Sequence, residues 1–177
     1  MKPLLKRFGF LIAAIAAVAA ITLFDASLGF KAVNIAGFSL KEMLLVLPPV
    51  FVLMGLLDVW VPKEIMIRYM GEGSGVKGIA LAILLGSAAA GPLYGAFPVA
   101  AVFMRKEVKF TNILIFIGAW STTKIPMFVF EMSALGTAFA VTRLLVDIPG
   151  IIIIAYALAA LIPKEEIKAL YKNAENL

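Results

Sequence analysis

Residues 77–105 read KGIALAILLGSAAAGPLYGAFPVAAVFMR, an apolar stretch that carries charge only at its two ends. As one straight helix it would be about 40 Å long, against about 30 Å for the hydrocarbon core of a bilayer. Glycine and proline interrupt its second half at Gly91-Pro92, Gly95 and Pro98. Backbone groups freed by such breaks are tolerated at membrane depth only inside protein or beside a water-filled cavity. Broken apolar segments of this kind indicate the substrate site of a transporter.

The composition of the whole chain is typical of a helical membrane protein. Hydrophobic residues make up 63% of the 177 residues and charged residues 15%, with a mean hydropathy of +1.03. Soluble domains are about half apolar and a quarter charged. The apolar runs are long and do not alternate as the strands of a transmembrane barrel would. We therefore predict an all-α, polytopic integral membrane protein with four to five transmembrane helices and a broken, re-entrant Gly-Pro hairpin.

The residue types that are missing exclude several kinds of chemistry. The chain contains no cysteine and no histidine, which excludes disulfides, thiolate metal sites and nucleophiles activated by histidine. No paired-carboxylate motif stands out, so we expect no enzyme activity, no cofactor and no metal site. The net charge of +5 arises from basic residues beside apolar runs, which favours lipid-headgroup contact over nucleic acid binding.

The amino-terminal half divides into two spans separated by a more polar stretch. The start could pass for a signal peptide, but its apolar part is long and the following DASLGF is a poor cleavage site, so we expect a retained span at Phe8–Phe24. Residues 25–42 resemble an interfacial amphipathic segment. The second span is predicted at Glu42–Val61, with a kink or unwound turn at Pro48-Pro49.

The remaining elements are predicted from apolar runs and helix-ending residues. We expect a short surface helix between Pro62 and Gly71, a span at Phe110–Phe130 that is interrupted at residues 118–126, and a last span at Thr137–Ile162. Residues 1–163 would form the transmembrane domain, and residues 164–177 a short charged cytosolic tail.

Two topologies follow from the basic residues. If residues 77–105 enter and return as a hairpin, most basic residues share one side of the membrane: Lys2, Lys6, Arg7, Lys63, Arg68, Lys77, Arg105, Lys106, Lys109, Lys164, Lys168 and Lys172. This arrangement, which we favour, obeys the positive-inside rule. If the segment crosses once, the charges divide almost evenly, and the chain could insert in both directions to form an inverted dimer.

Lys124 is the foremost candidate for a functional side chain. It lies inside a span, where a charge costs about 3 kcal/mol on insertion scales and must face the bundle interior or water. It could meet an anionic substrate, or form a structural pair with Asp58, Asp147 or Glu131.

The neighbours of Lys124 and the first break complete the predicted pathway. An indole in mid-span is unusual, because tryptophan favours the membrane interfaces, and nearby hydroxyls could bind an anion or bond to their own helix. The predicted pathway residues are Lys124, Trp120, Ser121, Thr122, Thr123, Pro126, Gly91, Pro92, Tyr94 and Pro98.

Three carboxylates are candidates for ion or proton coupling: Glu131, Asp58 and Asp147. Asp147 lies four residues after Arg143, on the same helix face, so the two could simply neutralise each other.

Four sequence stretches carry a resemblance to a known family: LPPVFVLMGLLDVWVP, MGEGSGVKG, GSAAAGPLYGAFPVAAVFMRK and FIGAWSTTKIPMFVFEMSALG. Over residues 43–162 the chain resembles the YraQ-type predicted permeases, which include the organoarsenical efflux permeases. The resemblance implies a half-size permease, because longer members contain two related halves and this chain matches one. It therefore implies a homodimer.

The resemblance carries over the two breaks but no substrate. Arsenical-transporting members have cysteine near the first break, where this chain has Ala88-Ala89-Ala90-Gly91 and no thiol. Trivalent arsenic prefers soft thiolate ligands, which puts arsenic transport in doubt. We expect a secondary-type permease of the cell membrane that moves a small anionic or polar solute as a dimer, with the two breaks facing each other; the alternative is a membrane scaffold subunit that transports nothing.

Overall fold

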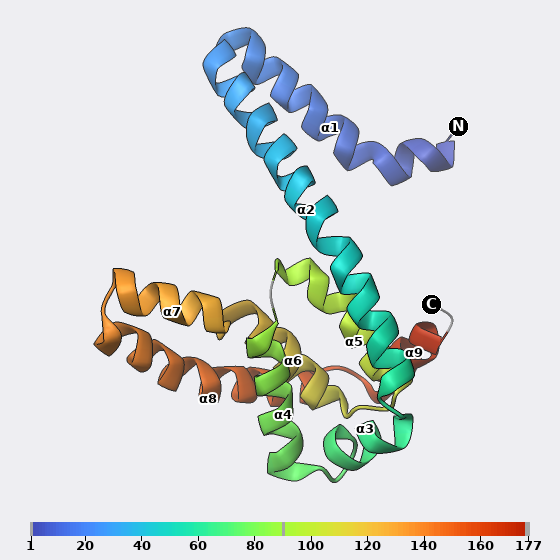
Figure 1. Cartoon of the computed structure of the whole chain (residues 1–177). Helices are drawn as coiled ribbons and strands as arrows, with labels where there is room; N and C mark the ends of the chain where they lie inside the picture. The colour runs from blue at the N-terminus through green and yellow to red at the C-terminus, as the bar shows by residue number, and fades with distance from the viewer. Residues whose placement is uncertain (1, 90, 176–177) are drawn as a thin grey trace. The chain divides into compact units, whose positions relative to one another are not determined.

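The computed structural model describes residues 2–89 and 91–175, which are helical with no strand among them (Figure 1). The elements are α1 (Lys2–Phe24), α2 (Ala26–Trp60), α3 (Lys63–Met70), α4 (Gly75–Ala88), the 3-10 turn η1 (Leu93–Gly95), α5 (Ala96–Arg105), α6 (Phe110–Thr122), α7 (Ile125–Ala134), α8 (Thr137–Leu161) and α9 (Lys164–Glu175). The description of α1 and α2 includes only part of their side chains. The chain forms two compact units, residues 1–47 and 48–177.

The first unit holds α1 and the first part of α2. Asp25 separates the two helices and caps α2, because its Oδ1 accepts hydrogen bonds from the backbone N–H of Ser27 at 2.9 Å and of Leu28 at 3.2 Å. The cap explains why α2 starts at once after α1. The predicted interfacial segment at residues 25–42 is thus wrong as a separate element: it is the first half of a 35-residue helix.

Of the kink or unwound turn predicted at Pro48-Pro49, the unwound turn is wrong. Helix α2 continues through both prolines to Trp60. Proline lacks a backbone N–H and costs about 3 kcal/mol inside a helix, but the apolar run on either side favours helix continuation. The two compact units divide at this proline pair, between Leu47 and Pro48.

In the second unit, glycine allows the helices to pack closely. A Cβ atom on Gly86 of α4 would lie 2.5 Å from the Phe116 carbonyl oxygen and 2.9 Å from the Trp120 nitrogen, both in the backbone of α6. A Cβ atom on Gly118 of α6 would lie 2.7 Å from Cγ2 of Ile151 in α8. Small residues at such crossings are the usual device for packing membrane helices. Helix α6 is therefore held between α4 and α8 (Figure 1).

The broken segment begins and ends at the same place. The backbone N–H of Lys109 donates to the Met70 carbonyl at 2.9 Å, and Asn112 Nδ2 donates to the same carbonyl at 2.8 Å. Helix α4 leads away from this point and α5 leads back (Figure 1). The two ends of the segment therefore lie side by side.

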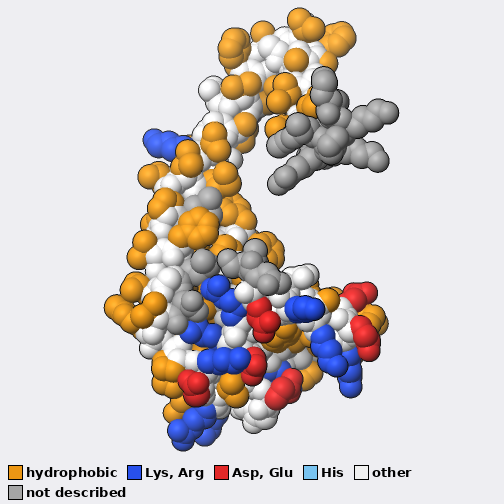
Figure 2. Space-filling model, turned by 90° about the vertical axis from the view of Figure 1, so that its right-hand side faces the viewer, with side chains coloured by type: hydrophobic (Ala, Val, Ile, Leu, Met, Phe, Trp, Pro, Cys, Tyr) orange, Lys and Arg blue, Asp and Glu red, His pale blue; other side chains and the backbone are white. Residues whose placement is uncertain are grey.

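Charged groups gather around this meeting point. Lys63 pairs with Glu107 at 2.7 Å, Lys109 lies 3.6 Å from Glu72, and Lys106 Nζ donates to the Val61 carbonyl at 2.6 Å. In Figure 2, blue and red side chains gather at the lower end of this unit.

Three helical stretches among the described residues are long and apolar enough to span a membrane: Ala26–Val52, Phe110–Ala134 and Thr137–Leu161. Shorter apolar helices cover Leu11–Phe24, Gly75–Ala88 and Leu93–Arg105. The all-α, polytopic membrane fold predicted from the sequence is confirmed. Pro62 and Gly71 flank α3 as predicted.

Candidate functional site

The first break separates α4 from α5. Helix α4 ends at Ala88, Gly91 has a φ of +100°, and Pro92 is extended with a ψ of 161°. Only glycine adopts such a positive φ without strain, so the glycine and the proline together produce the turn. Pro98 does not belong to this break. It is the third residue of α5, where a helix needs no N–H donor.

The second break separates α6 from α7. Helix α6 ends at Thr122, Lys124 has an extended ψ of 132°, and Pro126 is the second residue of α7. The interruption predicted at residues 118–126 is therefore two residues long, Thr123 and Lys124. Proline in the first turn of α7 both starts that helix and prevents α6 from continuing.

The two breaks touch each other. Lys124 Nζ donates a hydrogen bond to the Gly91 carbonyl oxygen, and Trp120 Nε1 lies 3.3 Å from that oxygen and 3.2 Å from the Pro92 carbonyl oxygen. One turn earlier in α4, the hydroxyl of Ser87 is 2.7 Å from that of Thr123. Lys124 and Trp120 thus bind the Gly91 carbonyl from the side of α6, and Trp120 adds a second donor to the Pro92 carbonyl, which also accepts from the Gly95 N–H at 3.0 Å.

Trp120 is at the centre of this contact. Its side chain is 2% exposed and its ring packs edge-on against Phe116, with 5.6 Å between ring centroids. The indole is therefore a buried donor that fixes the position of the first break. The sequence prediction places Trp120 in the solute pathway and does not include this hydrogen-bonding role; the signal for it was the mid-span position, since a buried indole needs a partner for its N–H.

The other predicted pathway residues are placed differently. Thr122 and Thr123 donate their hydroxyls to carbonyls four residues earlier, Gly118 at 3.0 Å and Ala119 at 3.1 Å. Ser121, Tyr94 and Pro126 are exposed. Among the three hydroxyl residues, Thr123 is the one whose hydroxyl bonds to α4, at Ser87.

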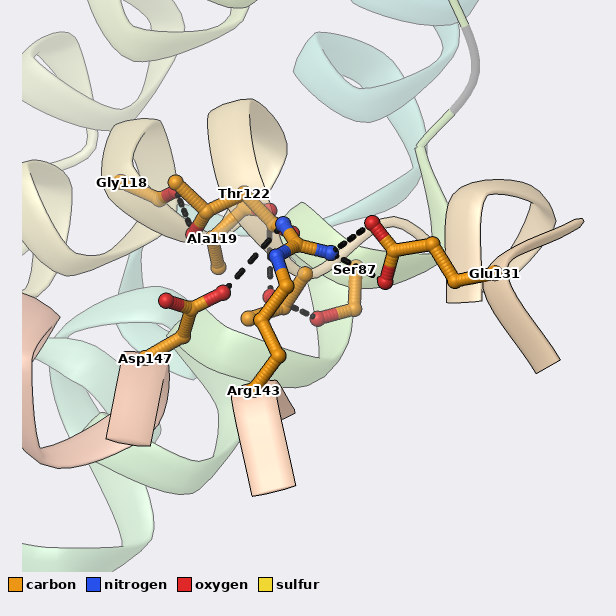
Figure 3. A network of polar contacts seen from close by, with 8 residues as sticks. Ser87, Gly118, Ala119, Thr122, Glu131, Arg143 and Asp147 are labelled. Atoms are coloured by element: carbon orange, nitrogen blue, oxygen red, sulfur yellow. Dashed lines mark hydrogen bonds and ion pairs between the residues drawn. The ribbon is translucent and has the colours of Figure 1, made fainter. Parts of the chain in front are cut away.

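Beside the second break, Arg143 of α8 binds two carboxylates (Figure 3). Its Nη1 is 2.5 Å from both oxygens of Glu131 in α7, and its Nη2 is 3.3 Å from Oδ2 of Asp147. Nη2 also donates to the Thr122 carbonyl at 2.5 Å. We call Glu131, Arg143 and Asp147 the ion cluster. Glu131 is 6% exposed although it lies near the end of a predicted span.

Sequence reasoning missed the central place of Arg143. The i, i+4 spacing to Asp147 suggested a self-neutralised pair, but Glu131 joins it from α7. Residues 131–147 contain two acidic residues and one basic residue. This uneven number indicated that a pair of Arg143 with Asp147 alone would leave one carboxylate without a partner. Glu131 and Asp147 form their ion pairs with Arg143 rather than with Lys124. The side chain of Asp58 lies outside the described residues.

An apolar groove lies next to the contact between the breaks. Its volume is about 440 Å³ and its lining is apolar except for Ser87 and Thr123; the apolar residues are Ala80, Ile83, Leu84, Ile125, Phe128, Leu144 and Ile148. The Ser87–Thr123 hydroxyl pair therefore forms the polar part of the groove lining. Within residues 2–89 and 91–175, no group of three acidic side chains gathers as metal ligands would.

A search of known families and proteins gives one match. The sequence model of the family ArsP_1, described as a predicted permease, matches residues 28–177. No curated protein and no solved structure matches the chain.

Proposed function

Because the chain belongs to the ArsP_1 family of predicted permeases, we propose that it moves a small anionic or polar solute across the cell membrane where its two breaks meet. The family is one of predicted permeases and the apolar helices indicate a membrane protein; the solute class and the route are our proposal.

The observation that carries this proposal is the bond from Lys124 to the Gly91 carbonyl. An ammonium group has three donors, and a charge inside a membrane span is retained at considerable cost. A neutral carbonyl compensates a cation less well than an anion does. A solute anion could therefore replace Gly91 as the partner of Lys124 and be released again when the two breaks close.

We propose that the segment from α4 to α5 is a re-entrant hairpin. Its ends are joined by the hydrogen bond from Lys109 to Met70, and the basic turn at residues 105–109 lies beside α3 and α9 through bonds to Val61 and Tyr171. This arrangement supports the topology in which these basic residues share one side of the membrane.

A complete pathway would require two copies of this chain. The resemblance to one half of longer permeases supports a homodimer, as does the apolar surface of α8, where Ile153 and Ile154 are exposed. The expected permease is thus a dimer of two half-size subunits, and each subunit contributes both breaks.

The ion cluster is our candidate for coupling to protons. Its two carboxylates and one guanidinium sum to a formal charge of −1. Oδ2 of Asp147 is buried and accepts no hydrogen bond. A proton bound by the cluster during transport would bring this formal charge to zero.

Uptake by proteoliposomes that contain the purified full chain tests the proposal. The probes are radiolabelled phosphate, sulfate, chloride and acetate, with glycerol as the neutral polar solute, each measured with and without an imposed proton gradient. We expect saturable uptake of at least one probe, faster with the gradient. Protein-free liposomes supply the leak rate. Uptake no faster than this leak for every probe would contradict the proposal and favour the scaffold alternative.

A further inference from the structure

The Thr122 carbonyl has lost its helix partner. In an α-helix this oxygen would accept from the N–H of the residue four positions later, which here is Pro126 and has no N–H. The carbonyl lies at the end of α6, beside the predicted solute contact. An unpaired carbonyl at membrane depth costs several kcal/mol, so another donor must replace the missing one.

Arg143 supplies that donor from a different helix. Its Nη2 lies 2.5 Å from the Thr122 oxygen, and its guanidinium is fixed on the other side by Glu131 (Figure 3). A planar guanidinium has donors in a rigid fork, so it can satisfy both partners in one orientation. A cation is also favourable at the carboxyl end of a helix.

The same relation occurs at the first break. There the unpaired carbonyl belongs to Gly91 and the cation is Lys124. Arg143 thus binds the backbone carbonyl of Thr122, two residues before Lys124. Lys124 in turn binds the Gly91 carbonyl of the first break. The position of Lys124 therefore depends on where Arg143 holds the end of α6.

We propose that Arg143 is a positioning residue for solute binding: it replaces the N–H that Pro126 lacks, keeps the second break open and thereby places Lys124. This inference rests on the proposed permease function. Glu131 and Asp147 hold the guanidinium in place, and Arg143 acts on the solute only through Lys124.

A double-mutant comparison tests the replacement directly. Purified full-length wild type, Arg143→Gln, Pro126→Ala and the double variant are compared by thermal unfolding in detergent. The Pro126→Ala substitution restores an N–H that can bond to Thr122. We expect Arg143→Gln to lower Tm by about 2–4 °C more when Pro126 is present than when Pro126→Ala accompanies it, the shift for one lost partner at this chain length. Equal losses in the two backgrounds would overturn the inference.

Arg143→Gln leaves two carboxylates without a cation. A second set of variants therefore allows the same Tm comparison if the proteins that carry Arg143→Gln fail to fold. Glu131→Gln and Asp147→Asn are introduced into all four proteins, so that Arg143→Gln no longer leaves two carboxylates without a cation. The amide oxygens of Gln and Asn still accept hydrogen bonds from the guanidinium where Arg143 is present, and the Thr122 carbonyl and residue 126 of each protein are unchanged. The same difference between the two backgrounds is expected.

Transport measurements distinguish a positioning role of Arg143 from a purely structural one. For the probe anion that the wild type moves, we expect Arg143→Gln to raise KM at least tenfold with a smaller change in maximal rate. We also expect Arg143→Lys, which keeps the positive charge and hydrogen-bond donors but not the planar fork, to recover part of the loss. An unchanged KM with a lower maximal rate would contradict the positioning role. If the wild type moves no probe, the permease proposal fails, but the Tm comparison still decides whether Arg143 replaces the missing N–H.

Discussion

At the scale of single residues, the site depends on cations that satisfy backbone carbonyls. Lys124 binds Gly91, and Trp120 donates to the same carbonyl and to that of Pro92. The sequence identified these residues because a lysine and an indole are out of place in mid-span. It could not identify their partners, since Gly91 is about 30 positions away and the contact depends on how α4 packs against α6.

Lys124→Ala should lower the rate of transport at least tenfold without unfolding the protein. The substitution removes a charged donor, whose hydrogen bond contributes about 1.5–3 kcal/mol, which corresponds to roughly a 10- to 100-fold lower rate at low solute concentration. Uptake by proteoliposomes measures this. Lys164→Ala, in the charged tail, is the matched control and should transport like the wild type. Wild-type uptake by Lys124→Ala would remove this lysine from the route.

At the scale of helices, the breaks were predictable and the extent of α2 was not. Glycine and proline end helices by local backbone chemistry, so Gly91-Pro92 and Pro126 marked both interruptions. Pro48 and Pro49 have the same local chemistry, yet α2 continues through them. Sequence pattern alone does not distinguish these cases, because the outcome depends on what surrounds each proline.

The crossing of α4 and α6 should tolerate no side chain at Gly86. A Cβ there would lie 2.5 Å from a backbone oxygen of α6, so Gly86→Ala forces the helices apart and should lower stability by about 1–3 kcal/mol. Gly150→Ala is the matched control, since a Cβ at Gly150 of α8 meets nothing within 4 Å. Thermal unfolding of the purified variants compares the two. A Tm for Gly86→Ala at or above that of Gly150→Ala would refute the close approach.

Helix α9 is fixed to the basic turn by Tyr171, whose hydroxyl donates to the Val108 carbonyl at 2.5 Å. Burial, with smaller contributions from Glu72 and Glu107, raises the pKa of Tyr171 to about 12. A raised pKa means that this contribution to stability is complete below pH 10 and is lost as the pH rises from about 10 to about 12.

The absorbance of tyrosinate should therefore include a late phase near pH 12. One of the four tyrosines should titrate near pH 12, and Tyr171→Phe should remove that late phase. A late phase that persists in Tyr171→Phe would assign it to a different tyrosine.

At the scale of the whole molecule, function requires a defined orientation in the membrane. The ends of the broken segment lie together, and the charged residues around them pair with one another. Both facts favour a hairpin over a full crossing. The sequence left these alternatives open because the charge of a loop does not reveal whether the chain between two loops returns.

Labelling of single cysteines distinguishes the two topologies. The chain has no native cysteine, and the side chains of Glu72 and Glu107 are 82% and 59% exposed on either side of the segment. In intact cells, a membrane-impermeant thiol reagent should label Glu72→Cys and Glu107→Cys to the same extent, because a hairpin puts both residues on one side of the membrane. Opposite reactivity would establish a crossing, and partial labelling of both would establish dual insertion.

The most direct test of the solute route is to lock the two breaks together reversibly. The hydroxyls of Ser87 and Thr123 are 2.7 Å apart, so cysteines at these positions should form a disulfide or bind one bridging Hg²⁺. The single variants Ser87→Cys and Thr123→Cys are the controls. We predict that locking the double variant stops uptake in proteoliposomes and that dithiothreitol restores it. Full uptake by the locked protein, or cysteines that cannot be bridged, would contradict the claim that the solute passes where the breaks meet.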